Sequence, residues 1–112
     1  MKTELSEKQC KACRPGTPKL TKAEIGLLLP EVPGWDMEKK RVEISKTFEF
    51  KDFYRTMAFV NAVAWMANQQ NHHPDMEVGY NKCKVRFSTH SVGGLSENDF
   101  ICAAKVEGLF EV

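Results

Sequence analysis

Three histidines are the side chains best suited to chemistry in this 112-residue sequence. His72 and His73 are adjacent, and His90 follows a segment in which polar and apolar residues alternate. An imidazole has an unperturbed pKa of about 6.5, so near neutral pH it can both donate and accept a proton. Adjacent histidines in a loop are also often simply solvated. Residue type and spacing therefore leave a catalytic and a solvated interpretation open.

Metal binding is the other chemistry that these residue types could support. No H-x-x-x-H or H-x-x-E-H spacing occurs, so we expect no metal site and no metal-dependent hydrolase. Cys10 and Cys13 form a single C-x-x-C pair, which is half of a zinc or redox motif, and a structural or incidental role is favoured over catalysis. Cys83 and Cys102 fall on apolar faces and are expected in the core.

The elements that must position the histidines can be read from hydrophobic periodicity. Apolar residues at helical spacing predict an amphipathic helix over about residues 52–70, with Asp52 as its N-cap and Pro74 beyond its end. Capping-box patterns at 21–24 and 96–99 predict two further helices, and the first stops at Pro30. Alternating polarity predicts four strands, over residues 35–38, 42–50, 77–80 and 83–89.

This element order predicts an α+β fold in which a four-stranded antiparallel sheet carries three helices on one face. Residues 1–20 are expected to be an irregular leader, and 21–112 a single domain. The exposed sheet edges favour dimerisation through an edge. Two histidines at a helix end and one at a strand end could then converge at one rim of the sheet.

Composition narrows the function classes. Hydrophobic residues make up 42% and charged residues 28%, and the formal net charge is only +1. These values exclude a disordered chain and argue against nucleic acid as a partner. The longest apolar run is too short to span a membrane, and the charged N-terminus lacks the apolar segment of a secretory signal. We therefore expect a cytoplasmic protein with reduced thiols and no membrane partner.

One family has a motif that this sequence closely resembles. The residues that carry the resemblance are Asn71-His72-His73-Pro74, Tyr80, Thr89-His90, Gly93-Gly94-Leu95-Ser96 and Asp99. In type and spacing they resemble pterin-4a-carbinolamine dehydratases, and the resemblance covers about residues 5–109. The leader and the segment before Trp35 look like those of bacterial members associated with phenylalanine hydroxylase. One position departs, because Asn68 stands where the family usually has an acidic residue.

The resemblance implies a fold whose sheet extends across a homodimer, with some members forming homotetramers. It implies the loss of water from 4a-hydroxytetrahydrobiopterin, the pterin-4a-carbinolamine, which gives the quinonoid dihydropterin. A hydro-lyase of this kind recycles the pterin cofactor of aromatic amino acid hydroxylases, which implies a functional link to phenylalanine hydroxylase. Histidine acid–base catalysis would need neither metal nor cofactor.

Roles for the site residues follow from the same resemblance. We assign His72 as the base and His73 and His90 as the proton donor and orienter at the departing hydroxyl. Asp99 could fix a histidine tautomer, or could serve only as the third residue of the last helix. The candidate pterin-binding residues are Asn68, Asn71, Ser88, Thr89, Asp99 and Trp35.

Four of these candidates come with a specific expectation. Ser88 and Thr89 could present backbone groups to the pterin edge. Trp35 could pack in the core or stack on a flat ligand. If the helix were continuous, Asn68 would share a face with His72.

The alternative function is a non-catalytic dimerisation or binding module, because some animal members of the family also act as a protein cofactor of a transcription factor.

Overall fold

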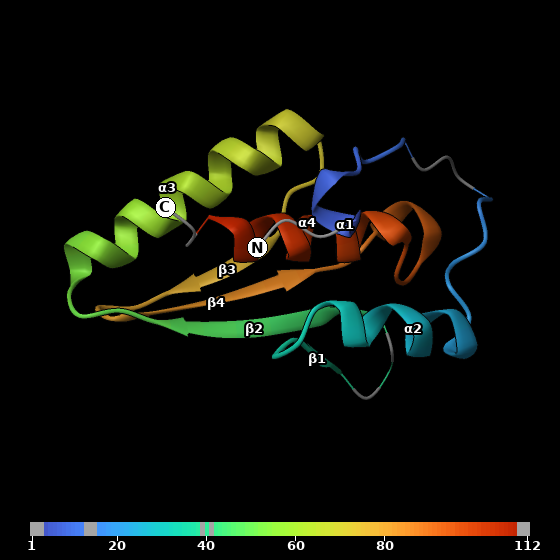
Figure 1. Ribbon diagram of the computed structural model, residues 1–112, viewed down its shortest axis with the longest axis horizontal. Helices are drawn as coiled ribbons and strands as arrows, with labels where there is room; N and C mark the ends of the chain where they lie inside the picture. Colours follow the sequence, from blue (N-terminus) through green and yellow to red (C-terminus); the bar gives the residue numbers. More distant parts are fainter. Residues whose placement is uncertain (1–3, 13–15, 39, 41, 110–112) are drawn as a thin grey trace.

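The computed structural model describes residues 4–12, 16–38, 40 and 42–109 (Figure 1). Cys13 and Lys39 lie outside the described residues. The elements in chain order are α1 (Glu4–Glu7), α2 (Lys22–Leu28), η1 (Leu29–Glu31), β1 (Asp36–Met37), β2 (Ile44–Glu49), α3 (Phe53–Gln70), β3 (Asp75–Val78), β4 (Lys82–Phe87), η2 (His90–Val92) and α4 (Glu97–Gly108). The two η elements are single turns of 3₁₀ helix.

The four strands form one antiparallel sheet in the order β1-β2-β4-β3. The central pair, β2 and β4, runs in register from Ile44 opposite Phe87 to Glu49 opposite Lys82. Helices α3 and α4 lie along one side of this sheet (Figure 1). Ile25 of α2 belongs to the same buried cluster, so α2 covers that face too. The predicted α+β architecture is confirmed.

The core lies between the sheet and the helices. Alternate residues of β2 and β4 are buried because their side chains point to one face: Ile44, Phe48, Cys83, Val85 and Phe87. They meet apolar residues of α3 and α4, among them Phe59, Val63, Met66, Phe100, Ile101 and Val106. Lys46 shares this face and interrupts its apolar pattern. Its ammonium lies 5.0 Å from the centre of the Phe48 ring and forms an ion pair with Glu107 of α4.

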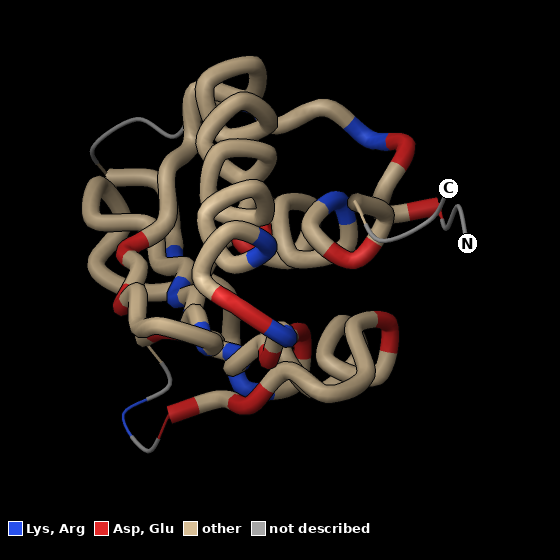
Figure 2. Tube along the Cα trace, turned by 90° about the vertical axis from the view of Figure 1, so that its left-hand side faces the viewer, with Lys and Arg blue, Asp and Glu red and all other residues tan. Residues whose placement is uncertain are grey.

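The opposite face of the sheet is charged. Arg86 of β4 pairs with Glu77 of β3, with Nη2 and Oε2 2.8 Å apart, and its Nε lies 3.8 Å from a carboxylate oxygen of Glu43. Acidic and basic residues are interspersed in Figure 2 rather than gathered on separate sides. No helix among the described residues is both long and apolar enough to cross a membrane.

The leader is more ordered than we expected. Residues Glu4–Glu7 form a helical turn, and Leu5 is only 4% exposed within the core. Lys105 of α4 donates from Nζ to the Ser6 carbonyl at 2.8 Å. A single leucine in a polar stretch forms no periodic pattern, so the sequence could not show that Leu5 is buried.

Two further expectations need correction. Strand β3 runs over Asp75–Val78 rather than over 77–80. It ends before Gly79 because this residue turns the chain, with its N–H bonded to the Lys82 carbonyl at 2.8 Å. The position of Trp65 inside the helix predicted at about 52–70 favours packing, yet this residue is 67% exposed. The buried stripe of α3 follows Phe59, Val63 and Met66, and the side chain of Trp65 points away from it.

Candidate active site

The first two histidines lie on the connection between α3 and β3. Asp52 caps the start of α3 through its side chain, as predicted, and Asn71 ends the helix in the left-handed conformation at φ 52° and ψ 40°. Asparagine tolerates this conformation better than most residues do. The turn carries His72 off the helix, so Asn68 and His72 do not share a helical face. The condition of that expectation, a continuous helix, is therefore not met.

His72 is held on two sides. Its ring stacks on Phe87 of β4, with centroids 6.0 Å apart and planes inclined by 10°. Its Nε2 lies 2.7 Å from Oδ1 of Asp99, which is the third residue of α4. The His72 side chain is 12% exposed, whereas that of Asp99 is fully buried. The imidazole is therefore fixed in position and orientation before any ligand binds.

The carboxylate of Asp99 is stabilised by more than His72. Its Oδ2 accepts hydrogen bonds from Thr89 Oγ1 at 2.8 Å and from the Ser96 backbone N–H at 2.9 Å. Because the Thr89 hydroxyl proton goes to Asp99, the Ser96 hydroxyl donates to Thr89 Oγ1 at 2.7 Å. A buried carboxylate is costly without such donors. Asp99 thus both caps α4 and holds His72, although we had treated these roles as alternatives.

Asp99 also sets the protonation chemistry of His72. Burial by itself lowers the pKa of His72, but the hydrogen bond and the negative charge of Asp99 outweigh it, and the pKa is raised above its ordinary value of 6.5. In the neutral form the proton on Nε2 points to Asp99, which leaves Nδ1 as the acceptor. The geometry therefore supports a proton-accepting role at Nδ1.

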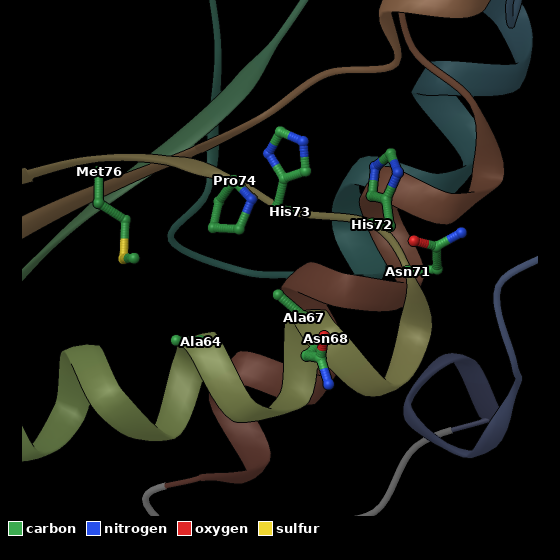
Figure 3. Close-up of a pocket in the computed structure, with 8 residues that line it drawn as sticks. All are labelled: Ala64, Ala67, Asn68, Asn71, His72, His73, Pro74 and Met76. Carbon is green, nitrogen blue, oxygen red and sulfur yellow. The ribbon is translucent and has the colours of Figure 1, made fainter.

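All three histidines line a common hollow at the rim of the sheet. This hollow has a volume of about 160 Å³, and its walls come from Asn71, His72, His73, Ser88, Thr89, His90 and Ser91. A second hollow of about 300 Å³ shares Asn71, His72 and His73 with it and extends to Met76 (Figure 3). A third, of about 370 Å³, shares Ser88, Thr89 and His90. The predicted convergence of the histidines is present in the structure.

The other two histidines differ from His72 in their surroundings. His73 and His90 are exposed. Among the described residues, neither imidazole makes a hydrogen bond to another side chain or to the backbone. In Figure 3 the rings of His72 and His73 project to the same side of the connection, whereas the Asn68 amide points away from both. Asn68 lines the second hollow without facing either ring.

The structure does not leave the Thr89 backbone available for a pterin edge. Its N–H donates to the Gly94 carbonyl at 2.8 Å, and its own carbonyl accepts from the N–H groups of Val92 at 3.1 Å and Gly94 at 3.4 Å. The Thr89 hydroxyl donates its hydrogen bond to Asp99 instead. Ser88 is only partly buried and lines two of the hollows, so it remains available for a ligand.

Trp35 belongs to the core and not to the site. It is 4% exposed, and its ring lies 6.0 Å from that of Phe48 and 5.9 Å from that of Phe87. Its indole N–H is buried without a hydrogen-bond partner among the described residues. The packing alternative is therefore correct, and stacking on a flat ligand does not fit.

Two residues that contribute to the site were not recognised from the sequence. Phe87 was not among the candidate site residues, yet it stacks on His72. Ser96 was assigned only as a helix cap, yet its backbone N–H and hydroxyl join the Asp99 network. The spacing of Ser96 and Asp99 is the signal that could have shown the N–H contact. Within the described ranges, no group of three or more His, Cys, Asp or Glu side chains could hold a metal ion.

Comparison with known proteins decides the family. The model of the pterin 4 alpha carbinolamine dehydratase family matches residues 18–109. The chain belongs to this family. A relative from Nitrosospira multiformis is 52% identical over 109 residues, which cover 97% of this chain and 95% of that protein. One from Nitrosomonas eutropha is 56% identical over 107 residues, covering 95% and 93%. Both carry the name "Putative pterin-4-alpha-carbinolamine dehydratase".

Solved structures show the same fold. A Brucella melitensis protein described as a transcriptional coactivator/pterin dehydratase superposes with a TM-score of 0.77 at 33% identity, covering 81% of this chain and 97% of that one. A pterin dehydratase-like protein, described as a RuBisCO assembly factor in the alpha-carboxysome, superposes with a TM-score of 0.61 at 23% identity, covering 70% and 90%. At that identity the second likeness concerns the fold alone.

Proposed function

We propose that this protein dehydrates 4a-hydroxytetrahydrobiopterin to the quinonoid dihydropterin. The observation that carries the proposal is the contact between His72 and Asp99 at a hollow that His73 and His90 also line. Membership of the pterin 4 alpha carbinolamine dehydratase family supports the substrate class. Recycling of the pterin for an aromatic amino acid hydroxylase, self-association and a cytoplasmic location stay predictions.

The reaction requires two proton movements. Hydroxide is a poor leaving group, so the oxygen on C4a must gain a proton as its bond to carbon breaks, and a ring nitrogen must lose one. In our proposal, Nδ1 of His72 accepts the proton from the ring nitrogen, because Nε2 is engaged with Asp99. The exposed His73 or His90, in its imidazolium form, donates to the departing oxygen. The net change is the release of one water molecule.

The proposed mechanism uses no metal and no cofactor. Both proton movements lie within the reach of imidazole chemistry, which contributes about 10²–10⁴-fold to a rate. We therefore expect the protein to retain full activity in the presence of a chelator. Loss of activity on chelation, with recovery on addition of zinc, would contradict this mechanism.

Stopped-flow absorbance of 4a-hydroxytetrahydropterin decay, with and without the protein, tests the activity. We expect decay that accelerates in proportion to protein concentration. A matched control is the exposed Gln69→Ala variant on α3, which should accelerate decay as the native protein does. Decay at the rate of buffer alone would reject the proposed activity.

A binding role is the second candidate. It is favoured by the 33% identical Brucella melitensis structure, whose description includes a transcriptional coactivator. In that case the protein would act as a non-catalytic dimerisation or binding module for another protein. A pull-down that recovers a stable protein partner, combined with decay of the pterin at the buffer rate, would favour this role over catalysis.

A further inference from the structure

Two thiols from opposite ends of the chain meet beside His72. Sγ of Cys10, in the leader, lies 3.5 Å from Sγ of Cys102 on α4, and both cysteines are free. Cys10 is partly exposed, whereas Cys102 is fully buried. Bonded sulfur atoms lie about 2.05 Å apart, so a movement of roughly 1.5 Å would join this pair. A small oxidant can therefore reach the Cys10 thiol, and the buried Cys102 thiol lies behind it.

Polar side chains hold Cys10 in this place. The Cys10 N–H donates to Gln70 Oε1 at 2.8 Å, at the end of α3. On α4, Asn98 bonds both backbone groups of Lys11, accepting from its N–H at 3.0 Å and donating to its carbonyl at 2.6 Å. Lys8 pairs with Glu97 at 2.9 Å. These directional contacts hold the leader to α4, so the meeting of the thiols does not depend on apolar packing alone.

The surroundings give the two thiols different reactivity. The hydrogen bond from Cys102 lowers the pKa of Cys10, and the nearby positive charges of His72 and Lys105 act in the same direction against the effect of burial. The hydrogen bond with Cys10 and burial both raise the pKa of Cys102. Because the thiolate is the nucleophilic form, Cys10 is the residue that reacts first.

We propose that Cys10 and Cys102 are an oxidative modification site, at which hydrogen peroxide converts the two thiols into a reversible disulfide. In the first step the Cys10 sulfur attacks a peroxide oxygen; an S–O bond forms, the O–O bond breaks, and the leaving oxygen departs as water. In the second, the Cys102 sulfur attacks Cys10 and expels the hydroxyl, which leaves with the Cys102 proton as a second water. Hydrogen peroxide gains the two electrons that the thiols lose.

The disulfide would fasten the leader to α4 next to the candidate site. Cys102 Sγ lies 3.9 Å from the His72 carbonyl oxygen, so the bond would form directly behind the connection that carries the histidine. It would also close a loop over most of the chain, which restricts the unfolded state. We therefore expect the oxidised protein to melt at a higher temperature than the reduced protein. The proposal does not depend on the dehydratase activity.

The test is titration of the reduced full-length protein with hydrogen peroxide, followed by free-thiol counting and peptide mapping without reduction. We expect two thiols to disappear and a Cys10–Cys102 peptide to appear. The Cys13→Ser variant should behave in the same way, although Cys13 lies outside the described residues. Dithiothreitol should restore both thiols and the lower melting temperature. The Cys10→Ser variant should form no such link.

Other products would overturn the proposal. A Cys10–Cys13 peptide in place of the expected one would mean that the C-x-x-C pair is the redox unit. Sulfinic or sulfonic acid on Cys10 with an intact Cys102 thiol would mean that the two sulfurs do not come together. Cys83, buried in β4, serves as the internal control and should stay reduced. Its oxidation together with Cys102 would indicate general oxidation of an unfolded chain.

Discussion

The three histidines of the site occupy two contrasting environments. His72 is stacked on Phe87, bonded to a fully buried carboxylate and 12% exposed. His73 and His90 are exposed, and their rings make no hydrogen bond among the described residues. One histidine is held in a single orientation before substrate arrives, whereas the other two are free to adjust to it.

This contrast suggests a division of labour. A base that abstracts a proton benefits from a fixed tautomer and a fixed position, which Asp99 gives to His72. A proton donor must be charged, and an exposed imidazole keeps its hydration when it is charged. In the proposed mechanism, the base therefore lies at the buried end of the hollow and the acid at its open end.

Removal of the base should have the largest effect. We expect His72→Gln to lower the catalysed rate by about 10²–10⁴-fold, because glutamine can still bond to Asp99 but cannot accept a proton in this pH range. Stopped-flow decay of the 4a-hydroxytetrahydropterin measures the loss, with Gln69→Ala as the matched control. A His72→Gln protein with native activity would show that the buried end is structural.

Removal of the exposed histidines should have a smaller effect. We expect either His73→Gln or His90→Gln, whichever removes the proton donor, to lower the catalysed rate about tenfold. This corresponds to an increase of roughly 1.4 kcal/mol in the barrier. Melting temperatures should be native in both, since both side chains are exposed. Native rates in both variants would contradict the assignment of the proton donor to an exposed histidine.

The smallest effect is expected at Asn68. A glutamate there would add a negative charge to the hollow that His72 and His73 line, which raises the pKa of a nearby histidine. The Asn68 side chain is exposed and points away from both rings, so solvent and salt should screen most of that charge. We expect Asn68→Glu to shift the pH–rate profile upward by a fraction of a unit. A downward shift would contradict this placement of residue 68.

Much of the fold could be predicted from the sequence because its signals are local. The helix at 53–70, the cap at Asp52 and the alternation in β2 and β4 depend on neighbours within a few residues. The convergence of the histidines followed from the ends of these elements. The architecture was therefore accessible before any coordinates were known.

What the sequence did not reveal depends on single residues and on distant contacts. Asn71, in the left-handed conformation, ends the helix before His72, and hydrophobic periodicity does not predict such a residue. Cys10 and Cys102 are 92 positions apart and meet only because Gln70 and Asn98 bind the leader. The second role of Asp99 also required coordinates, because a helix-cap pattern does not show that a histidine lies opposite it.

The pH–rate profile of Asp99→Asn, measured beside that of the native protein, tests most directly whether Asp99 prepares His72 as the base. Asp99 raises the pKa of His72, so the native rate should climb with pH through a value above 6.5, as the base becomes neutral. With asparagine the charge is gone and burial remains, so this limb should move to lower pH. An asparagine amide that donates to Nε2 would also favour the tautomer with its proton on Nδ1, so the maximal rate should fall by about tenfold or more, roughly 1.4 kcal/mol. Circular dichroism should first confirm that the variant is folded. A folded Asp99→Asn protein with a native maximal rate and an unmoved limb would contradict the account.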